Sequence, residues 1–240
     1  MREYLIFRLY GAMASWGEIA VGEMRSSSVH PSKSAVLGLI AAAMGIDRKE
    51  EQLHRRMAEG YGFAARIDCV GTPLADYHTA QVPPGEKQRN LSTRRDELLA
   101  VPKAKLKTIL STREYRMDAL AVVALWARTQ EPLYPLAGLA EALRHPVYTL
   151  YLGRKSCPLA IPLEAQIIQG NTLRDALVKA VFVKHEEFAS FKRAGLYWED
   201  GVEAGVEPEH VFRRRDVPLS RRRWQFDVRS EYHSTCSEED

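Results

Sequence analysis

Residues 4–10 read Tyr-Leu-Ile-Phe-Arg-Leu-Tyr. Leu5, Phe7 and Leu9 alternate with other bulky side chains, so both faces of an extended segment here carry bulk. That pattern is typical of an inner strand of a sheet. We therefore expect the fold to begin with an inner strand, and the segments that follow indicate what surrounds it.

The apolar periodicity continues through six further segments. It predicts a helix over 36–44 that Gly45 ends, a helix over 47–59, strands over 63–69 and 117–126, a helix over 136–143 and a fourth strand over 147–152. The order β-α-β-β-α-β predicts an α+β, ferredoxin-like domain over residues 1–155. RNA-recognition (RRM-like) modules share this arrangement.

The remaining segments lie outside this pattern. Residues 81–112, broken by Pro83-Pro84-Gly85 and again by Pro102, are expected to form an insertion, a hairpin or arm that projects from the domain. Residues 156–233 are expected to form a smaller β-rich region, with short strands at 165–168, 180–183, 211–212 and 224–228. The polar, acidic residues 234–240 are expected to be a flexible tail.

Composition narrows the class of protein. No run approaches 18 apolar residues, so no membrane span is expected. The three cysteines are far apart, which fits neither a disulfide framework nor a zinc site and favours a reducing, cytoplasmic compartment. No P-loop, zinc-protease helix or serine-hydrolase motif is found. We therefore expect no metal and no cofactor.

Positive charge is concentrated in two segments. Residues 81–116 contain nine Lys or Arg against four acids, and residues 211–229 contain seven Arg against two Asp, so each carries +5. The whole chain carries only +3, so the other residues together carry −7. Two such segments indicate a polyanion partner, with plain solvated faces as the alternative.

Two segments are candidates for holding phosphate. Gly153 and Pro158 bracket Arg154, Lys155 and Ser156 in a turn that offers cations, a hydroxyl and free backbone N–H groups. The expected helix entry at Ser32, Lys33 and Ser34 offers the positive end of a helix dipole and further donors. An ordinary basic surface loop and plain helix capping are the respective alternatives.

Three aromatic or histidine side chains each have more than one possible role. Trp16, in a glycine-flanked loop, is either a stacking platform or part of the core. Tyr77 and His78, with nearby lysines, are suited to metal-free cleavage of RNA, with a base for the 2′-hydroxyl and cations for the phosphate. The alternative is that they stack on or bond to RNA without cleavage, or pack in the protein. Binding without cleavage is the preferred interpretation.

An ordered set of landmarks resembles one family, the CasD subunits of type I-E CRISPR Cascade complexes, in the RAMP superfamily. The landmarks lie within residues 1–165: the strand at 4–9, Trp16-Gly17, Arg25, the segment 31–34, the helix from Leu37 to Gly45, Asp76-Tyr77-His78-Thr79, the segments 113–116 and 123–126, and above all the segment 151–159. The arginine triplets 213–215 and 221–223 lie outside the resemblance and stay unassigned.

The resemblance implies a function in antiviral defence. Proteins of this family bind and cap the 5′ handle of the CRISPR RNA, contact the large subunit CasA and the backbone subunit CasC, and share the complex with CasB and CasE, so that target DNA is met indirectly. A thumb folds over the guide, and residues 81–112 fall at its position. The alternative is a metal-independent endoribonuclease that processes precursor CRISPR RNA.

The resemblance also assigns expected roles to residues. The residues expected to hold handle phosphates are Ser32, Lys33, Ser34, Arg154, Lys155 and Ser156. The residues expected to contact bases or sugars are Arg25, Tyr77 and His78, with Trp16 as the stacking candidate. The residues expected to follow the guide backbone are Lys103, Lys105, Lys107 and Arg113.

Overall fold

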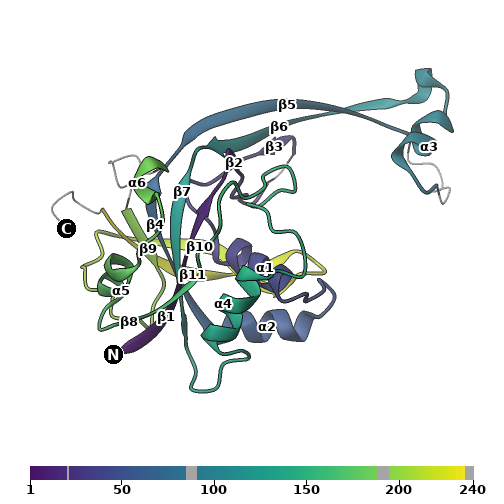
Figure 1. Ribbon diagram of the computed structural model, residues 1–240. Coiled ribbons are helices and arrows are strands. Elements are labelled where there is room, and N and C mark those ends of the chain that lie inside the picture. The colour runs from purple at the N-terminus through teal and green to yellow at the C-terminus, as the bar shows by residue number, and fades with distance from the viewer. Residues whose placement is uncertain (21, 85–90, 189–194, 236–240) are drawn as a thin grey trace.

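A computed structural model of the chain describes all residues except 21, 85–90, 189–194 and 236–240 (Figure 1). The described strands are β1 (Arg2–Tyr10), β2 (Met13–Ala14), β3 (Met24–Arg25), β4 (Tyr61–Cys69), β5 (Thr72–Val82), β6 (Lys107–Met117), β7 (Leu120–Ala127), β8 (Gln166–Gly170), β9 (Gly195–Trp198), β10 (His210–Ser220) and β11 (Gln225–Ser234). The described helices are α1 (Lys33–Ala43), α2 (Glu51–Gly60), α3 (Arg94–Leu99), the short 3₁₀ helix η1 (Lys103–Lys105), α4 (Leu136–Arg144), α5 (Leu173–Lys179) and α6 (His185–Phe188). None of the described helices has the length and apolar character needed to cross a membrane.

One large antiparallel sheet organises the body of the molecule. Its seven strands lie in the order β10-β11-β9-β4-β7-β1-β8. β1 pairs with β7 on one side and with β8 on the other, which confirms the inner strand expected from residues 4–10. The mixed α and β character of the prediction is therefore confirmed.

The alternation in β1 separates two hydrophobic cores. Leu5 and Phe7 point into the larger core, which lies between the sheet and helices α1, α2 and α4 (Figure 1). Tyr4 and Ile6 point into the smaller core on the opposite face, under α5. Because successive side chains of a strand point to opposite faces, one short segment supplies both cores.

A long two-stranded arm projects from the body. It consists of residues 72–117, in which β5 and β6 pair from Thr72↔Met117 to Val82↔Lys107, and α3 lies at its far end (Figure 1). The arm therefore begins nine residues before the insertion expected at 81–112. The strand predicted over 117–126 corresponds to β7, which begins three residues later at Leu120, and Met117 is the last residue of β6.

Two predicted strands are wrong. Residues 147–152 form no strand ladder, because the backbone N–H groups of Val147 and Tyr148 donate to Ala43 and Ala42 at the end of α1. The strand that pairs with β1 on its free side is β8 instead. Residues 180–183 form no strand either.

The region beyond residue 155 shares the main sheet. β9 pairs with β4, and β8 pairs with β1, so strands from both sides of the expected boundary are neighbours. The division at residue 155 stays a prediction. Ser234, predicted to lie in the tail, is buried and ends β11, while residues 236–240 lie outside the described residues.

Candidate nucleic-acid interface

The basic loop, residues 153–158, is held rigidly on the body. Leu152 and Cys157 at its two ends are fully buried, and the Leu152 N–H donates to the Cys157 carbonyl at 2.7 Å. Gly153 has φ +84°, and a Cβ there would lie 1.9 Å from the Ser15 carbonyl oxygen. Only glycine fits this position, where the backbone is left-handed and touches a second segment. The anchored loop leaves Lys155 and Ser156 exposed.

Arg154 connects the basic loop to the root of the arm. Its guanidinium carbon lies 4.7 Å from the centroid of the Tyr115 ring on β6, a cation–π geometry. Its Nη2 also donates to the Arg25 carbonyl oxygen on β3 at 3.5 Å. Three segments that are distant in the sequence therefore meet at this arginine.

Arg25 and Arg113 extend this arrangement. They are paired residues of the parallel strands β3 and β6. Arg113 and Tyr115 lie two positions apart on β6 and so share a face of the strand. We call Arg25, Arg113 and Arg154 the arginine cluster. Within the described residues none of its members forms an ion pair, although Asp76 on β5 is the direct cross-strand neighbour of Arg113.

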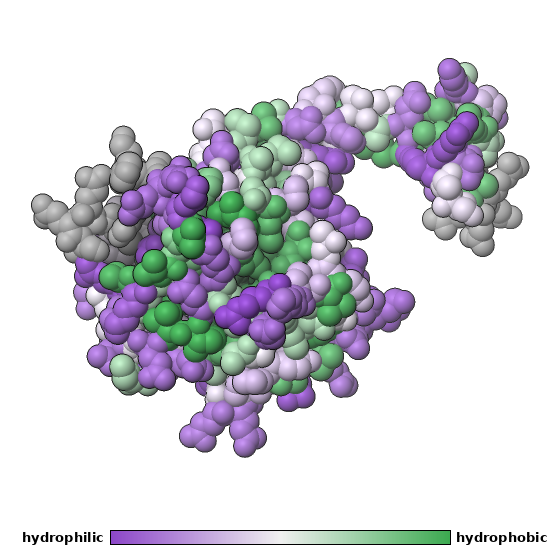
Figure 2. Space-filling model, in the orientation of Figure 1, coloured by the Kyte–Doolittle hydropathy of each residue, from purple (hydrophilic) through white to green (hydrophobic). Residues whose placement is uncertain are grey.

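The arm carries the other exposed candidates. Tyr77 is 66% exposed on β5, opposite Thr112, and His78 is the next residue, opposite Ser111. Exposed lysines follow toward the far end of the arm: Lys103 and Lys105 on η1, and Lys107 at the start of β6. In the space-filling view the arm projects clear of the body, with much of its surface hydrophilic (Figure 2).

Three of the predicted contacts are buried: Trp16, Lys33 and Ser32. Trp16 is 3% exposed and packs in the larger core, so it is a core residue and not a stacking platform. Lys33 is 2% exposed, and its Nζ donates to both carboxylate oxygens of Glu199 at 2.9 and 3.0 Å. Its ammonium therefore faces Glu199 on the C-terminal side of β9 and offers no free charge to a phosphate.

The serines beside Lys33 act mainly on the helix. Ser32 is the N-cap of α1 and accepts from the Ala35 N–H at 3.1 Å. Ser34 is half-buried, and its hydroxyl lies 3.0 Å from that of Ser32. The capping alternative is thus confirmed for Ser32, and Ser34 is the more accessible of the two.

A buried ionic network holds the start of α1 on β10 and β11. Asp216 accepts from the Lys33 backbone N–H at 2.8 Å and from both Nε and Nη2 of Arg229. Arg229 and Arg214 also contact Glu231. Burial by itself raises the pKa of Glu231, but the hydrogen bond from His30 and the two guanidinium groups lower it to about 2.

Part of the arginine-rich segment 211–229 belongs to this ionic network. Arg214 and Arg229 face inward to carboxylates and are not available to a polyanion. Sequence reasoning missed this role because the hairpin brings each arginine to acids that lie 2 to 17 positions away in the sequence. It also missed Arg48, Arg221 and Trp224, which meet beside α1.

Among the described residues no group of three His, Cys, Asp or Glu side chains is placed to hold a metal ion. Cys157 is fully buried, and burial raises the pKa of its thiol, which disfavours the reactive thiolate. The arrangement is suited to holding an anionic chain along the arginine cluster and the arm.

Comparisons with known proteins identify the family of this chain. Residues 4–231 match the sequence model of the family described as CRISPR-associated protein (Cas_Cas5). The CRISPR system Cascade subunit CasD of Escherichia coli (strain K12) is 35% identical over 186 residues, which cover 74% of this chain and 77% of that protein.

Solved structures show the same fold. A chain of a structure titled "CRISPR RNA-guided surveillance complex" superposes with a TM-score of 0.63 at 25% identity, covering 97% of this chain and 89% of that one. A structure titled "Crystal structure of Cas protein" has a TM-score of 0.57 at 24% identity, covering 98% of this chain and 96% of that one. The second likeness concerns the fold alone.

Proposed function

Since this chain belongs to the CRISPR-associated Cas5 family, we propose that it is a non-catalytic subunit of a Cascade surveillance complex that binds and caps the 5′ handle of the CRISPR RNA. The observation that carries this proposal is the arginine cluster. Arg154 reaches the Arg25 backbone at 3.5 Å, and Arg25 is paired with Arg113. These three cations lie on adjoining segments, and within the described residues none forms an ion pair, so their charges are available to a phosphate chain.

The rest of the RNA path follows from the cluster. Lys155 and Ser156 lie on the exposed side of the basic loop and would hold handle phosphates, together with Ser34. Arg113 continues onto the arm, where Lys103, Lys105 and Lys107 would follow the guide backbone. Tyr77 and His78 would contact bases or sugars. Trp16, Ser32 and Lys33 are left out of the proposed contacts because they are buried.

We further propose that the arm is the thumb of a RAMP protein and that β4, β7, β1 and β8 form a ferredoxin-like core. The antiparallel order β4-β7-β1-β8, with α1 and α4 between the strands in the sequence, supports this reading. By its resemblance to CasD, the chain would contact CasA and CasC in a cytoplasmic complex that also contains CasB and CasE, and would meet target DNA only through that complex.

Geometry disfavours a mechanism in which Tyr77 and His78 act as a pair, and the cleavage test below addresses the use of either residue with a lysine. Tyr77 and His78 are consecutive residues of β5, so their side chains point to opposite faces of the arm. A base and an acid that act on one phosphate must converge on it. These two side chains diverge, so we propose that they contact different parts of the RNA.

The test is binding of a labelled RNA with the repeat-derived 5′ handle, in EDTA. We expect the wild-type chain to prefer this RNA to a scrambled sequence and to leave it intact. Replacing both Arg154 and Lys155 by Ala should weaken binding and lower the salt slope by about 1.4, since each phosphate contact on a single strand contributes about 0.7. Cleavage that is lost in His78→Ala would establish the endoribonuclease instead.

A matched control removes the same charge elsewhere. Arg55 and Arg56 are exposed on α2 and lie outside the proposed path. The double change Arg55→Ala and Arg56→Ala should keep the wild-type salt slope. Equal losses in the two double variants would show that only net charge matters and would contradict a handle site at the basic loop.

A further inference from the structure

A cavity of about 530 Å³ lies beside the basic loop. Its walls come from one side of α1 along most of its length, the loop around Gly17, the α1–α2 connection at 46–48, the segment 148–153 and the tip of the β10–β11 hairpin. Gly153 belongs to this lining, so the cavity extends to the start of the basic loop. Its volume falls within the ordinary range for small-ligand sites, roughly 300–1,000 Å³.

The wall contains a buried cation without a counter-ion. Arg221 is 9% exposed, its Nη2 donates to the Ser34 carbonyl oxygen at 2.5 Å, and its guanidinium lies over Gly38 of α1. Within the part of the chain that the structure describes, it has no carboxylate partner, and its buried Nε has no hydrogen-bond partner. Burial and the nearby Arg48 lower the pKa of Arg221 to about 10. An unpaired buried charge is unfavourable until an anion joins it.

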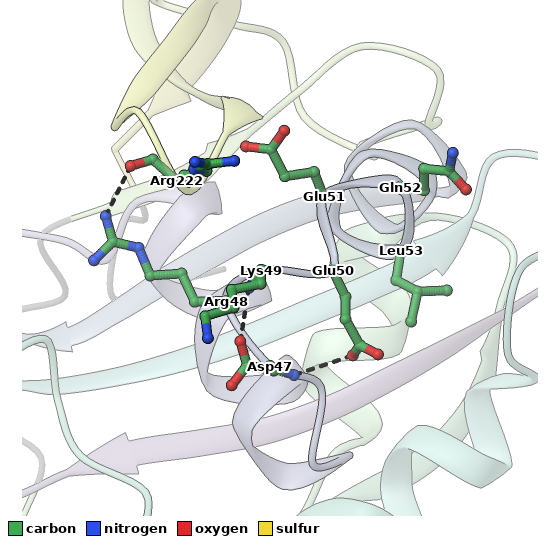
Figure 3. A pocket seen from close by; sticks show the side chains of 8 residues that line it. All are labelled: Asp47, Arg48, Lys49, Glu50, Glu51, Gln52, Leu53 and Arg222. Atoms are coloured by element: carbon green, nitrogen blue, oxygen red, sulfur yellow. Dashed lines mark hydrogen bonds between the residues drawn. The ribbon is translucent and has the colours of Figure 1, made fainter.

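Arg48 fixes the hairpin tip against the α1–α2 connection. Its Nε donates to the Arg221 carbonyl oxygen at 2.7 Å, and its Nη2 donates to the Arg222 carbonyl oxygen at 3.2 Å (Figure 3). Its guanidinium carbon lies 4.4 Å from the Trp224 ring. Two guanidinium groups therefore line one cavity in fixed positions.

Aromatic rings surround the same cavity. Trp224 is 59% exposed and has φ +52°, a left-handed conformation that favours Gly or Asn over a bulky residue. Tyr148 and Tyr151 are 50% and 38% exposed, and the Phe226 ring lies 6.0 Å from the Trp224 ring. Flat apolar rings beside cations are the surroundings that stacked nucleotide bases take in single-stranded RNA sites.

Two acids also line the cavity, Glu18 and Asp47, and Asp47 accepts from the Lys49 backbone N–H at 2.8 Å. Within the described residues neither carboxylate forms an ion pair with Arg221 or Arg48. A neighbouring hollow of about 1090 Å³, shown in Figure 3, is lined by residues 47–53 and Arg222, and it has three acids, three cations and no aromatic ring. The smaller cavity is the better match for an anionic ligand with a ring because it has the buried Arg221 and the aromatic rim.

We infer that this cavity receives one nucleotide of the bound guide RNA, with its phosphate at Arg221 and Arg48 and its base against the aromatic rim. The inference rests on the proposed function, because the RNA would reach the cavity from the basic loop at Gly153. It assigns a role to one of the arginine triplets, 221–223, that the family resemblance leaves without one.

The first experiment measures RNA affinity by fluorescence anisotropy. Arg221→Gln should weaken binding of the handle RNA about tenfold and lower the salt slope by about 0.7. Arg223→Gln is the matched control, because Arg223 is exposed on the same hairpin and does not line the cavity. It should stay within about twofold of the wild type. Equal affinities for the two variants and the wild type would overturn the inference while leaving the proposed function intact.

The second experiment does not depend on the stability of a buried-arginine variant. 2-Aminopurine is placed at each handle position in turn, and its fluorescence is read with wild-type protein and with Trp224→Ala. One position should be quenched by the wild type and recover at least twofold in the variant. No position that differs between the two proteins would contradict the inference. If the wild type fails to bind the handle at all, the proposed function fails first.

A third experiment measures assembly with other subunits and distinguishes an RNA ligand of the cavity from a protein ligand. If Arg221→Gln and Trp224→Ala bind RNA like the wild type but fail to join purified CasA or CasC, the cavity is a protein contact and the inference is wrong.

Discussion

The Arg154 guanidinium stacks on the Tyr115 ring, with 4.7 Å between the guanidinium carbon and the ring centroid. Tyr115 is buried at the root of the arm, and Arg154 is half-buried in the basic loop. The ring therefore fixes the direction of a cation that would otherwise sample many rotamers, and fixing it beforehand lowers the entropic cost of binding a phosphate.

This relationship predicts a difference between two substitutions of Tyr115. Tyr115→Leu removes the ring face and should weaken binding of the handle RNA about threefold to tenfold. Tyr115→Phe keeps the face and should bind like the wild type. Combined with Arg154→Ala, the Leu variant should add little further loss, and anisotropy titrations of the four proteins measure this coupling. Independent, additive losses would contradict the stacking role.

Gly153 allows a second prediction, on stability. Ala at this position would have to adopt φ +84° and would place its Cβ 1.9 Å from the Ser15 carbonyl oxygen. Gly153→Ala should therefore lower the free energy of unfolding by about 2 kcal/mol or more, as strained backbone positions do. Urea denaturation measures the change. Gly138→Ala is the control: a Cβ there meets only Pro135, at 3.5 Å, so on α4 it should be neutral or stabilising.

The sequence was most informative where one side of a segment is buried. The alternation of Leu5, Phe7 and Leu9 correctly predicts an inner strand because two cores select the side chains on either face. The arm gave no such signal. Most of β5 is exposed on both faces, so no alternation marks it, and its first nine residues were assigned to no strand. The segment 147–152 has aromatic and β-branched residues typical of strands, yet its backbone groups bond to the end of α1.

The roles of charged residues were harder to predict from the sequence for a different reason. A sequence shows where a cation lies but not which carboxylate folds against it. Lys33 looks like a phosphate ligand at a helix entry, and only its neighbour Glu199, 166 positions away, makes it an internal ion pair. Arg154, Lys155 and Ser156 were predictable because glycine and proline place them in an exposed turn.

Lys33 and Lys155 form a matched pair for a third prediction. Lys33→Met removes one partner of a buried ion pair and should lower the free energy of unfolding by about 3 kcal/mol. The loss is moderated because Arg128 also contacts Glu199 at 3.1 Å. Lys155→Met removes the same charge from an exposed site and should leave stability unchanged. Urea denaturation of both variants measures this.

RNA binding by the same two variants should show the opposite pattern, with the loss in Lys155→Met. Lys155→Met should weaken handle binding and lower its salt slope by about 0.7, and folded Lys33→Met should keep the wild-type slope. A lower slope in Lys33→Met would restore it as a phosphate ligand.

Glu231 supports a prediction on acid stability. Its pKa is about 2 in the folded protein, against an ordinary value of 4.5, because His30, Arg214 and Arg229 stabilise the carboxylate. A carboxyl whose pKa is lower when folded adds stability above its unfolded pKa, and that stability is lost as the pH falls toward the folded value. The shift corresponds to about 3 kcal/mol, lost between about pH 5 and pH 2.

His30 acts in the same direction. Burial lowers its pKa below 6.5, although the hydrogen bond to Glu231 opposes this shift. A histidine whose pKa is lower when folded also adds stability that is lost as the pH falls below its unfolded value. Denaturation at a series of pH values should therefore show stability declining from about pH 6.5 downward. Glu231→Gln should be less stable at pH 7 and lose less between pH 5 and pH 2 than the wild type. Parallel profiles for the two proteins would show that the network around Glu231 does not hold its carboxylate in the charged form.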